Sequence, residues 1–309
     1  MSSNDTVIDT TTNGSGSGSG GSRSVTVIGL GPMGQAMAAA LLDRGYDVTL
    51  WNRTASRADA LVARGARLAP SVREALAANE LVLLSLTDYA AMYDLLGPAE
   101  GALVGRVLVN LSSDTPEEAR RAARWASDRG AVQLTGGITV PPSGIGKPES
   151  STFYSGPRDA FDRHRRALEV VTGTTDYRGE DPGLAALLYQ IGMTMFWTSM
   201  LSYWQATALA RANGLTASDI LGHAVDTANS LPGFFTFYAD RIDAGNHDGD
   251  VDRLAMGTAS VEHVLHTHAD AGVDTALPAA VAGLFRRGMD AGGATESFSG
   301  LVELMKKAD

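Results

Sequence analysis

The order of apolar and polar positions divides the chain into an α/β half and a helical half. Up to residue 181, short apolar runs typical of buried strands alternate with segments whose apolar positions recur at helical spacing. Strands that alternate with helices predict a doubly wound, parallel sheet. From residue 182 onward only the helical spacing persists. We therefore expect a Rossmann-like domain over 25–181, a long connecting helix over 182–212 and an all-helical domain over 213–309.

Turn residues and apolar runs define the elements within each half. The last predicted strand is 151–156, and strand signals end by residue 179. In the helical half, 231–240 is an aromatic-rich stretch that we expect to be a loop entering a helix. The predicted strands are 25–28, 47–51, 67–70, 81–86, 106–112, 132–137 and 151–156, and the predicted helices of the first half are 35–45, 56–65, 71–79, 89–96 and 115–130.

Composition narrows the class of protein. Residues 1–24 are polar and rich in Gly and Ser, which predicts a flexible tail outside the fold. The chain has 309 residues and a net charge of −10, which disfavours nucleic acid and anionic membranes as partners. The absence of cysteine excludes disulfides, thiolate metal sites and a cysteine nucleophile. No signal peptide is recognised, and we expect a cytoplasmic protein.

The stretch 183–210 contains no charged residue and is long enough to span a bilayer. It also contains polar side chains such as Gln190, Thr194 and Gln205, and it is the one such stretch in the chain. These features favour a helix buried inside a protein over a membrane span. Because such a helix needs a second apolar surface, we expect a homodimer in which the helical domains interlock.

A glycine-rich motif marks the cofactor site. It follows the first predicted strand and opens the first predicted helix, which is the context that a dinucleotide-binding turn requires. The glycines allow the pyrophosphate to approach the helix N-terminus closely. The motif consists of Gly29, Leu30, Gly31, Pro32, Met33 and Gly34.

The residues after the second strand select the form of the cofactor. NAD-binding proteins usually place Asp or Glu here to hold the ribose hydroxyls. This chain has Asn52, Arg53 and Thr54, with Arg57 one helical turn further. Two guanidinium groups and a hydroxyl suit a 2′-phosphate, so we predict NADPH as the cofactor.

The carboxyl ends of later strands should border the same crevice. Leu86 and Thr87 follow the fourth strand, and Asn110 and Ser112 follow the fifth. We expect these four residues to contact the ribose and the nicotinamide. The alternative interpretation is that small polar residues here only cap helices.

The layout resembles the β-hydroxyacid dehydrogenases. Their connecting helix carries the pattern G-x-x-x-x-x-K-x-x-N, whose lysine acts as an acid for a developing alkoxide. Counting from Gly183, this chain has Tyr189 at the lysine position and Gly192 at the asparagine position. The departure at both positions makes hydroxyacid chemistry our second hypothesis.

Five segments taken together resemble the NADPH-dependent imine reductases. In that family the position of Tyr189 is Asp or Tyr, and tyrosine members are associated with the (S)-amine. The resemblance implies a helical C-terminal domain like that of 6-phosphogluconate dehydrogenase and reduction of imines to amines, extending to reductive amination. The segments are GLGPMGQAMA, WNRT, NLSSDTP, GGITVPPSGIG and LLYQIGMTMFW.

The chemistry of imines is consistent with the missing lysine. A ketone needs an acid because negative charge develops on its oxygen, whereas an iminium ion is already protonated and hydride transfer neutralises it. The hydroxyl of Tyr189 can hydrogen-bond the imine nitrogen or orient it. We therefore predict Tyr189 as the catalytic residue. By resemblance, Ser113, Ile138, Met193 and Trp197 line the substrate pocket. We expect the aromatic-rich stretch 231–240, with Phe234, to close the pocket of the partner subunit, although core packing explains this stretch almost as well.

Two further hypotheses follow from the sequence. A regulator that binds NADP without turnover would have the same motifs, since a fold alone does not decide function.

Glu262, His263 and His266 are spaced so that they could face a metal, but a solvated helix face is favoured and we predict no metal.

Overall fold

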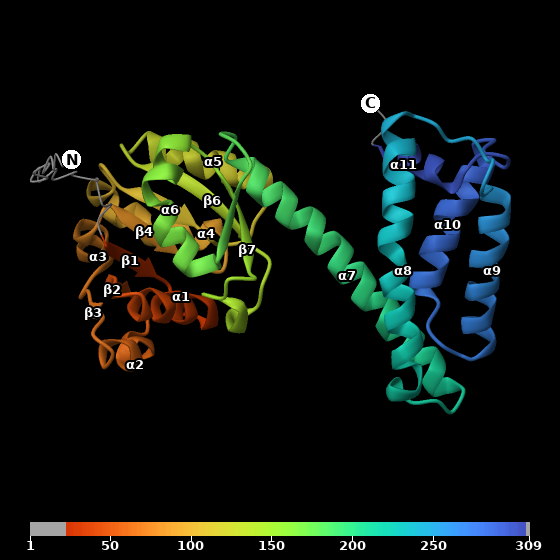
Figure 1. Ribbon diagram of the computed structural model, residues 1–309, viewed down its shortest axis with the longest axis horizontal. Coiled ribbons are helices and arrows are strands. Elements are labelled where there is room, and N and C mark those ends of the chain that lie inside the picture. Colours follow the sequence, from red (N-terminus) through yellow and green to blue (C-terminus); the bar gives the residue numbers. More distant parts are fainter. Residues whose placement is uncertain (1–22, 307–309) are drawn as a thin grey trace, which may run out of the picture. The chain divides into compact units, whose positions relative to one another are not determined.

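The computed structural model describes residues 23–306 (Figure 1) and divides after Met193 into two compact units. The predicted tail lies, up to residue 22, outside the described residues. Ser24 already belongs to the first strand, so the first unit begins one residue before the predicted Val25.

The first unit is built on an eight-stranded sheet with the order β3-β2-β1-β4-β5-β6-β7-β8. Strands β1 and β4 are neighbours although the chain connects them through β2 and β3, so the direction of winding reverses there. Ligands of such sheets bind at the carboxyl ends of the strands near this reversal. The strands are β1 (Ser24–Ile28), β2 (Asp47–Trp51), β3 (Arg67–Leu68), β4 (Leu81–Leu84), β5 (Val107–Asn110), β6 (Val132–Ile138), β7 (Ser151–Ser155) and β8 (Thr174–Tyr177).

The predicted helices of the first unit follow their strands and the α/β class is confirmed, but the helix over Arg158–Thr172 was not predicted. Strand β4 is buried along its whole length, as expected for a parallel strand covered on both faces. Ser71, Asp88 and Thr115 each accept a backbone N–H at a helix start. The helices are α1 (Pro32–Asp43), α2 (Asp59–Val62), α3 (Val72–Ala78), α4 (Tyr89–Leu96), α5 (Pro116–Ser127) and α6 (Arg158–Thr172), with 3-10 turns at Ala55–Ala58, Gly97–Ala102 and Pro142–Gly144.

Three further features of the first unit differ from the prediction. Strand β7 runs antiparallel to β6, because the connection between them contains only a 3-10 turn and no crossover helix. Strand β8 was not predicted, since its TTDY sequence has almost no apolar character, yet it pairs with β7. The predicted helix 56–65 is a 3-10 turn followed by a single α-helical turn.

Helix α7 (Gly183–Ala212) is one continuous helix of 30 residues. By length and composition it could cross a membrane. Within its most apolar stretch of 18 residues, only 11% is buried. The division between the two units falls within this helix.

The second unit is helical, as predicted. Thr216 and Asp219 form a capping box at the start of α8, and Figure 1 shows α9 and α10 side by side. Within 231–240 the expected helix is present, but the loop expected before it is wrong: α8 continues through Pro232, because a single missing backbone N–H does not outweigh the helical residues on both sides. The helices are α8 (Ala217–Asp243), α9 (Leu254–Asp270), α10 (Ala276–Asp290) and α11 (Leu301–Leu304), with a 3-10 turn at Phe298–Gly300.

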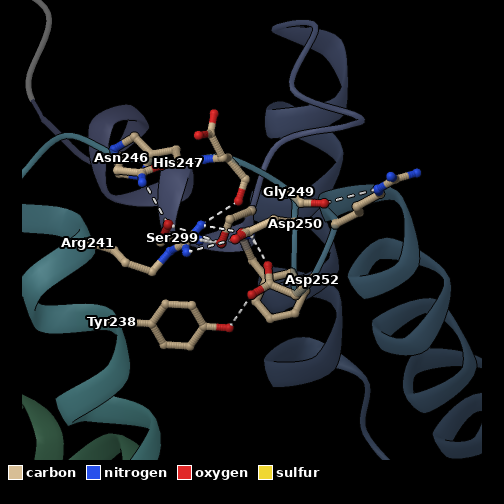
Figure 2. A network of polar contacts seen from close by, with 12 residues as sticks. Tyr238, Arg241, Asn246, His247, Gly249, Asp250, Asp252 and Ser299 are labelled. Carbon is tan, nitrogen blue, oxygen red and sulfur yellow. Dashed lines mark hydrogen bonds and ion pairs between the residues drawn. The ribbon is translucent and has the colours of Figure 1, made fainter.

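A polar network ties the end of α8 to the loop that follows it (Figure 2). The Tyr238 hydroxyl donates to the buried Asp252 carboxylate over 2.6 Å, and the other oxygen of Asp252 accepts the Phe298 N–H. Arg241 pairs with Asp250 at 2.7 Å. These bonds fix the connection between α8 and α9 without a large apolar core.

Candidate active site

The glycine motif forms an open cradle above the start of α1. A Cβ at Gly29 would overlap the Ser85 carbonyl oxygen, and one at Gly34 would overlap the Gly29 carbonyl oxygen. At Gly31, by contrast, no atom lies within 4 Å of the position that a Cβ would occupy, and this residue caps α1 without a side-chain hydrogen bond. The helix start at Gly31 therefore borders open space, and the first N–H groups of a helix have no partner within the helix, as pyrophosphate binding requires.

A groove of about 600 Å³ extends from this cradle along the carboxyl ends of β1, β2 and β4. Asn52 shapes it: its Oδ1 accepts the Leu30 N–H at 2.9 Å, and its Nδ2 donates to the Thr54 carbonyl at 2.8 Å. The Asn52 side chain thus links the glycine turn to the loop after β2. The predicted cofactor residues that line the groove are Gly29, Leu30, Gly31, Pro32, Met33, Asn52, Arg53, Thr54, Arg57, Leu86 and Thr87.

The charge at one end of the groove fits a 2′-phosphate. Arg53 and Arg57 are exposed, and neither guanidinium is paired with a carboxylate in the described part of the chain. Thr54 lies between them. These side chains are available to a dianionic phosphate without first breaking an ion pair.

A second pocket, of about 260 Å³, adjoins the groove and contains Tyr189. Met33, Ser85, Leu86 and Thr87 line both spaces, so the groove continues into this pocket. The predicted residues Ser112, Ser113 and Ile138 also line it, on the side of β5 and β6.

Asn110 occupies a different place from the predicted one. It is fully buried and lines neither space, because its amide is used internally: Oδ1 accepts the Ser112 N–H and Nδ2 donates to the Met92 sulfur. Ser112 in turn accepts the Leu86 N–H through its Oγ. Asn110 therefore positions the strand ends rather than facing the crevice.

The first turn of α7 is fixed by polar contacts from the sheet. The buried Ser155 Oγ accepts the Ala185 N–H and donates to the Pro182 carbonyl, both at 3.0 Å. Asp181 accepts the first N–H of the helix and forms a two-pronged pair with Arg120. The hydrogen bond from Arg120 holds the pKa of the Asp181 carboxyl below its ordinary value. Together these contacts set where Tyr189 lies, two turns further.

Gly137 lets α7 approach β6 closely at the pocket. A Cβ at this position would lie 2.9 Å from the Ala185 carbonyl oxygen and 3.1 Å from the Tyr189 Cβ. Any side chain there would push the helix away from the strand. The GG pair of the sequence therefore has a geometric role at the site.

Two predicted pocket residues, Met193 and Trp197, do not line the pocket, while the placement of Phe234 from the partner subunit stays a prediction. Along a helix, Met193 and Trp197 lie about 6 Å and about 12 Å beyond Tyr189, which carries them past the residues that enclose this space. Trp197 is 54% exposed, and Phe234, on α8 in the second unit, is 56% exposed.

Two polar residues at the pocket were not predicted. Asp114 lines it directly after Ser113, and the sequence signal was available, since Asp114 belongs to the NLSSDTP segment. Thr135, on β6, is buried and lines the floor. Burial raises the pKa of the neighbouring Tyr89 above its ordinary value, and the nearby Thr135 hydroxyl offsets this effect only in part.

No group of three or more His, Cys, Asp or Glu side chains that could hold a metal occurs within residues 23–306. Glu262, a candidate ligand by spacing, is instead paired with Arg286 through two hydrogen bonds of 2.5 and 2.7 Å.

The fold and the groove define the class of protein, a dinucleotide-dependent oxidoreductase with a Rossmann domain followed by a helical domain. Residues 24–179 match the NAD-binding domain of 6-phosphogluconate dehydrogenase, and residues 181–307 match the NADPH-dependent reductive aminase-like C-terminal domain.

Similar proteins narrow this class to a family. An imine reductase of Streptomyces aurantiacus is 68% identical, with 92% of this chain and 100% of that chain covered and a TM-score of 0.89. A reductive aminase of Aspergillus terreus, solved with NADPH and ethyl-5-oxohexanoate, is 32% identical over 92% and 100% of the two chains, with a TM-score of 0.87. An NADPH-dependent reductive aminase of Aspergillus oryzae is 29% identical over 92% of this chain and 97% of that protein.

The chain belongs to the imine reductase family. The predicted class, an NADPH-dependent oxidoreductase acting on C=N bonds, is thereby confirmed. Membership of this family favours imine reduction over hydroxyacid dehydrogenase activity and over a regulator without turnover.

Proposed function

We propose that this enzyme reduces small cyclic imines and their iminium ions to amines in the pocket beside Tyr189, and that it performs reductive amination when a ketone and an amine are both supplied. The observation that carries the proposal is the lining of this pocket, in which Tyr189 occupies the helix position of the dehydrogenase lysine and the lining contains no Lys or Arg. A pocket without a cation suits a positively charged iminium substrate.

The residues of the groove would hold NADPH along its length. Arg53, Thr54 and Arg57 would contact the 2′-phosphate, and the backbone N–H groups above Gly31 would contact the pyrophosphate. Leu86 and Thr87, two of the four residues shared by groove and pocket, would lie at the nicotinamide end, with Ser112 and Ser113 beside it. When bound, NADPH supplies the hydride that converts the iminium carbon to the amine carbon and leaves NADP⁺.

Tyr189 would orient the substrate nitrogen. Its hydroxyl donates a hydrogen bond to a neutral imine nitrogen, and its ring offers an apolar face that attracts an iminium cation. Hydride transfer neutralises the cation, so no strong acid is needed to stabilise a developing negative charge. The apolar surfaces of Ile138 and Leu111 would exclude water from the reacting carbon.

NADPH consumption with 1-pyrroline or 2-methyl-1-pyrroline tests this proposal. We expect imine-dependent oxidation of NADPH and much slower oxidation of NADH. NADPH consumption with glyoxylate, measured in parallel, tests for hydroxyacid dehydrogenase chemistry. Turnover of glyoxylate without turnover of any imine would overturn the proposal, and tight NADPH binding without either turnover would restore the regulator hypothesis.

The proposal includes a homodimer with interlocked helical domains. Helix α8 has no buried residue, and Phe234, Phe235 and Phe237 on it are 56, 49 and 40% exposed. Large exposed aromatic patches are rare on monomeric soluble proteins and mark interaction sites. In this arrangement the partner subunit contributes the aromatic face of α8 to the pocket. Light scattering in solution should give twice the mass of the 32.3 kDa chain.

Two finer points belong to the same proposal. The tyrosine at position 189 supports formation of the (S)-amine, which chiral chromatography of reduced 2-methyl-1-pyrroline would measure. A cytoplasmic location is supported by the absence of cysteine. Fractionation of expressing cells would test it.

A further inference from the structure

A single charged side chain lies in the otherwise uncharged lining of the Tyr189 pocket. Asp114 follows Ser113 at the carboxyl end of β5, and the other residues that line this space are apolar, glycine or neutral polar. We infer that the Asp114 carboxylate attracts the positively charged nitrogen of the iminium substrate and of the amine product. This inference rests on the proposed function. It adds that the pocket selects positively charged molecules.

The chain holds the Asp114 carboxylate in place by backbone groups. Its Oδ1 accepts the Thr115 N–H at 2.7 Å, and its Oδ2 accepts the Tyr89 N–H at 3.4 Å. Thr115 and Tyr89 lie at the starts of α5 and α4, where the helix dipoles favour negative charge. The Asp114 carbonyl accepts a hydrogen bond from Gln190, the neighbour of Tyr189 on α7, at 3.0 Å. This hydrogen bond therefore links Asp114 to the helix that carries Tyr189, and both residues line the same pocket.

The charge of Asp114 is not neutralised by the protein. Within residues 23–306, no Lys, Arg or His side chain lies within ion-pair distance of its carboxylate, in contrast to Asp181, which pairs with Arg120. Backbone N–H groups orient the carboxylate but carry no net charge. The charge is left for a cation that enters the pocket.

Hydride transfer determines what such a charge does to the kinetics. The iminium ion enters as a cation and loses its charge as hydride arrives, so attraction to Asp114 is stronger in the bound substrate than in the transition state. An interaction of this kind lowers KM without raising kcat. Asp114 therefore acts in selecting and holding the cation, whereas Tyr189 acts at the reacting bond.

The Asp114→Asn variant removes the charge and keeps a side-chain oxygen for the Thr115 N–H. With a permanently charged iminium, such as an N-methyl-3,4-dihydroisoquinolinium ion, we expect KM to rise about tenfold or more, because a charge pair a few ångströms apart is lost from a partly desolvated site. We expect kcat to stay the same or to rise. Affinity for NADPH should be unchanged.

A matched pair of inhibitors isolates the charge. Pyrrolidine is a cation at neutral pH, and tetrahydrofuran is a neutral ring of nearly the same size. In the enzyme saturated with NADP⁺, Asp114→Asn should weaken pyrrolidine binding about tenfold and leave tetrahydrofuran binding unchanged, while Asp114→Glu should restore part of the pyrrolidine affinity.

Asp88→Asn is the control for a nearby charge outside the pocket. Asp88 caps α4 through the Ala91 N–H and does not line this space, and Asn retains the capping oxygen. This variant should leave both inhibitors unaffected.

The outcomes separate this inference from the proposed function. Equal weakening of pyrrolidine and tetrahydrofuran, or a fall in kcat together with NADPH affinity, would overturn the inference and give Asp114 a purely structural role. A wild-type enzyme that reduces no imine would overturn the proposed function. Calorimetry of pyrrolidine binding to the NADP⁺ complex would then still decide whether Asp114 recognises a cation.

Discussion

The two units use their apolar residues in opposite ways. In the first unit, apolar side chains from the sheet and its helices form two buried clusters that enclose β1, β4 and β5. In the described part of the second unit, Leu254 is the one large aliphatic side chain that is buried, while long helices expose aromatic rings. The first unit completes its own core and its own cofactor groove. The second has the composition of a domain whose core is completed by another surface.

The groove and the Tyr189 pocket both belong to the first unit. Every residue that lines the groove and the Tyr189 pocket lies before the division after Met193. We therefore expect damage to the second unit to leave NADPH binding intact and to act on turnover through assembly. Substitutions at the groove or pocket of the first unit should directly lower the affinity for the cofactor or the rate of the chemical step.

Charges on the exposed aromatic faces should have the largest effect. In the Trp204→Glu/Phe235→Glu variant, two unpaired carboxylates would enter an apolar interface at a cost of roughly several kcal/mol. We expect a monomer by light scattering, a loss of imine reduction of about a hundredfold or more, and NADPH affinity within a few-fold of wild type.

Val104→Glu is the matched control for this variant. Val104 is 65% exposed in the first unit, so a glutamate there meets only water. A dimer that survives the double substitution on α7 and α8 would show that these faces do not form the interface.

Removal of both guanidinium groups from the groove should have the next largest effect. Arg53→Ala/Arg57→Ala removes two charge-assisted hydrogen-bonding groups of about 1.5–3 kcal/mol each, so the Kd for NADPH should rise about a hundredfold or more. The Kd for NADH should change little, as measured by fluorescence titration. Arg64→Ala is the control, since Arg64 pairs with Asp43 outside the groove. Equal weakening of both cofactors would contradict the assignment of the 2′-phosphate.

Loss of the Tyr189 hydroxyl should have a moderate effect. Tyr189→Phe removes one hydrogen bond to the imine nitrogen, worth about 1–1.5 kcal/mol, and should lower kcat about tenfold. NADPH affinity should not change. Tyr93→Phe, in which the hydroxyl lies outside the pocket, is the control. Unchanged turnover with several imines would remove Tyr189 from the mechanism.

The smallest effect is expected from the polar network of the second unit. Tyr238→Phe removes the hydrogen bond to Asp252 and should lower the free energy of unfolding by about 1–2 kcal/mol near neutral pH. Burial, together with the Asp252 hydrogen bond, raises the pKa of Tyr238 to about 12. An unfolded tyrosine titrates near 10, so the folded state holds this proton more tightly.

The sign of the pH dependence follows from that difference. The stabilisation by Tyr238 is complete below about pH 10 and is lost as the pH rises toward 12. Urea unfolding between pH 8 and 11 should therefore show a steeper decline in wild type than in Tyr238→Phe. Parallel declines would mean that Tyr238 is not the group that titrates.

Local patterns in the sequence were sufficient to find most residues that line the groove. Gly29, Gly31 and Gly34 could be assigned because each has a separate backbone requirement, and Arg53 and Arg57 because charge at that strand end is diagnostic. These signals depend on residues near one another in the chain. The helical half was recognised for the same reason, since helical periodicity is local.

The misses arose where distant residues decide the structure. Strand β8 forms because β7 offers it a free edge, and α8 continues through Pro232 because its surroundings outweigh one lost hydrogen bond. Asn110 was placed in the crevice because its carboxamide suits a ligand, whereas Met92 and Ser112 use it. Asp114 was overlooked because its role depends on α7 closing the pocket on its other side.

The contact between Gly137 and α7 bears on how this kind of active site changes during evolution. The close approach involves the Ala185 carbonyl and, at residue 189, only the Cβ, an atom that every amino acid except glycine has. Lysine, aspartate and tyrosine can therefore replace one another there without moving the helix backbone. A lineage could exchange one acid for another in a single substitution, because the scaffold constrains where the side chain begins and leaves its chemistry to selection.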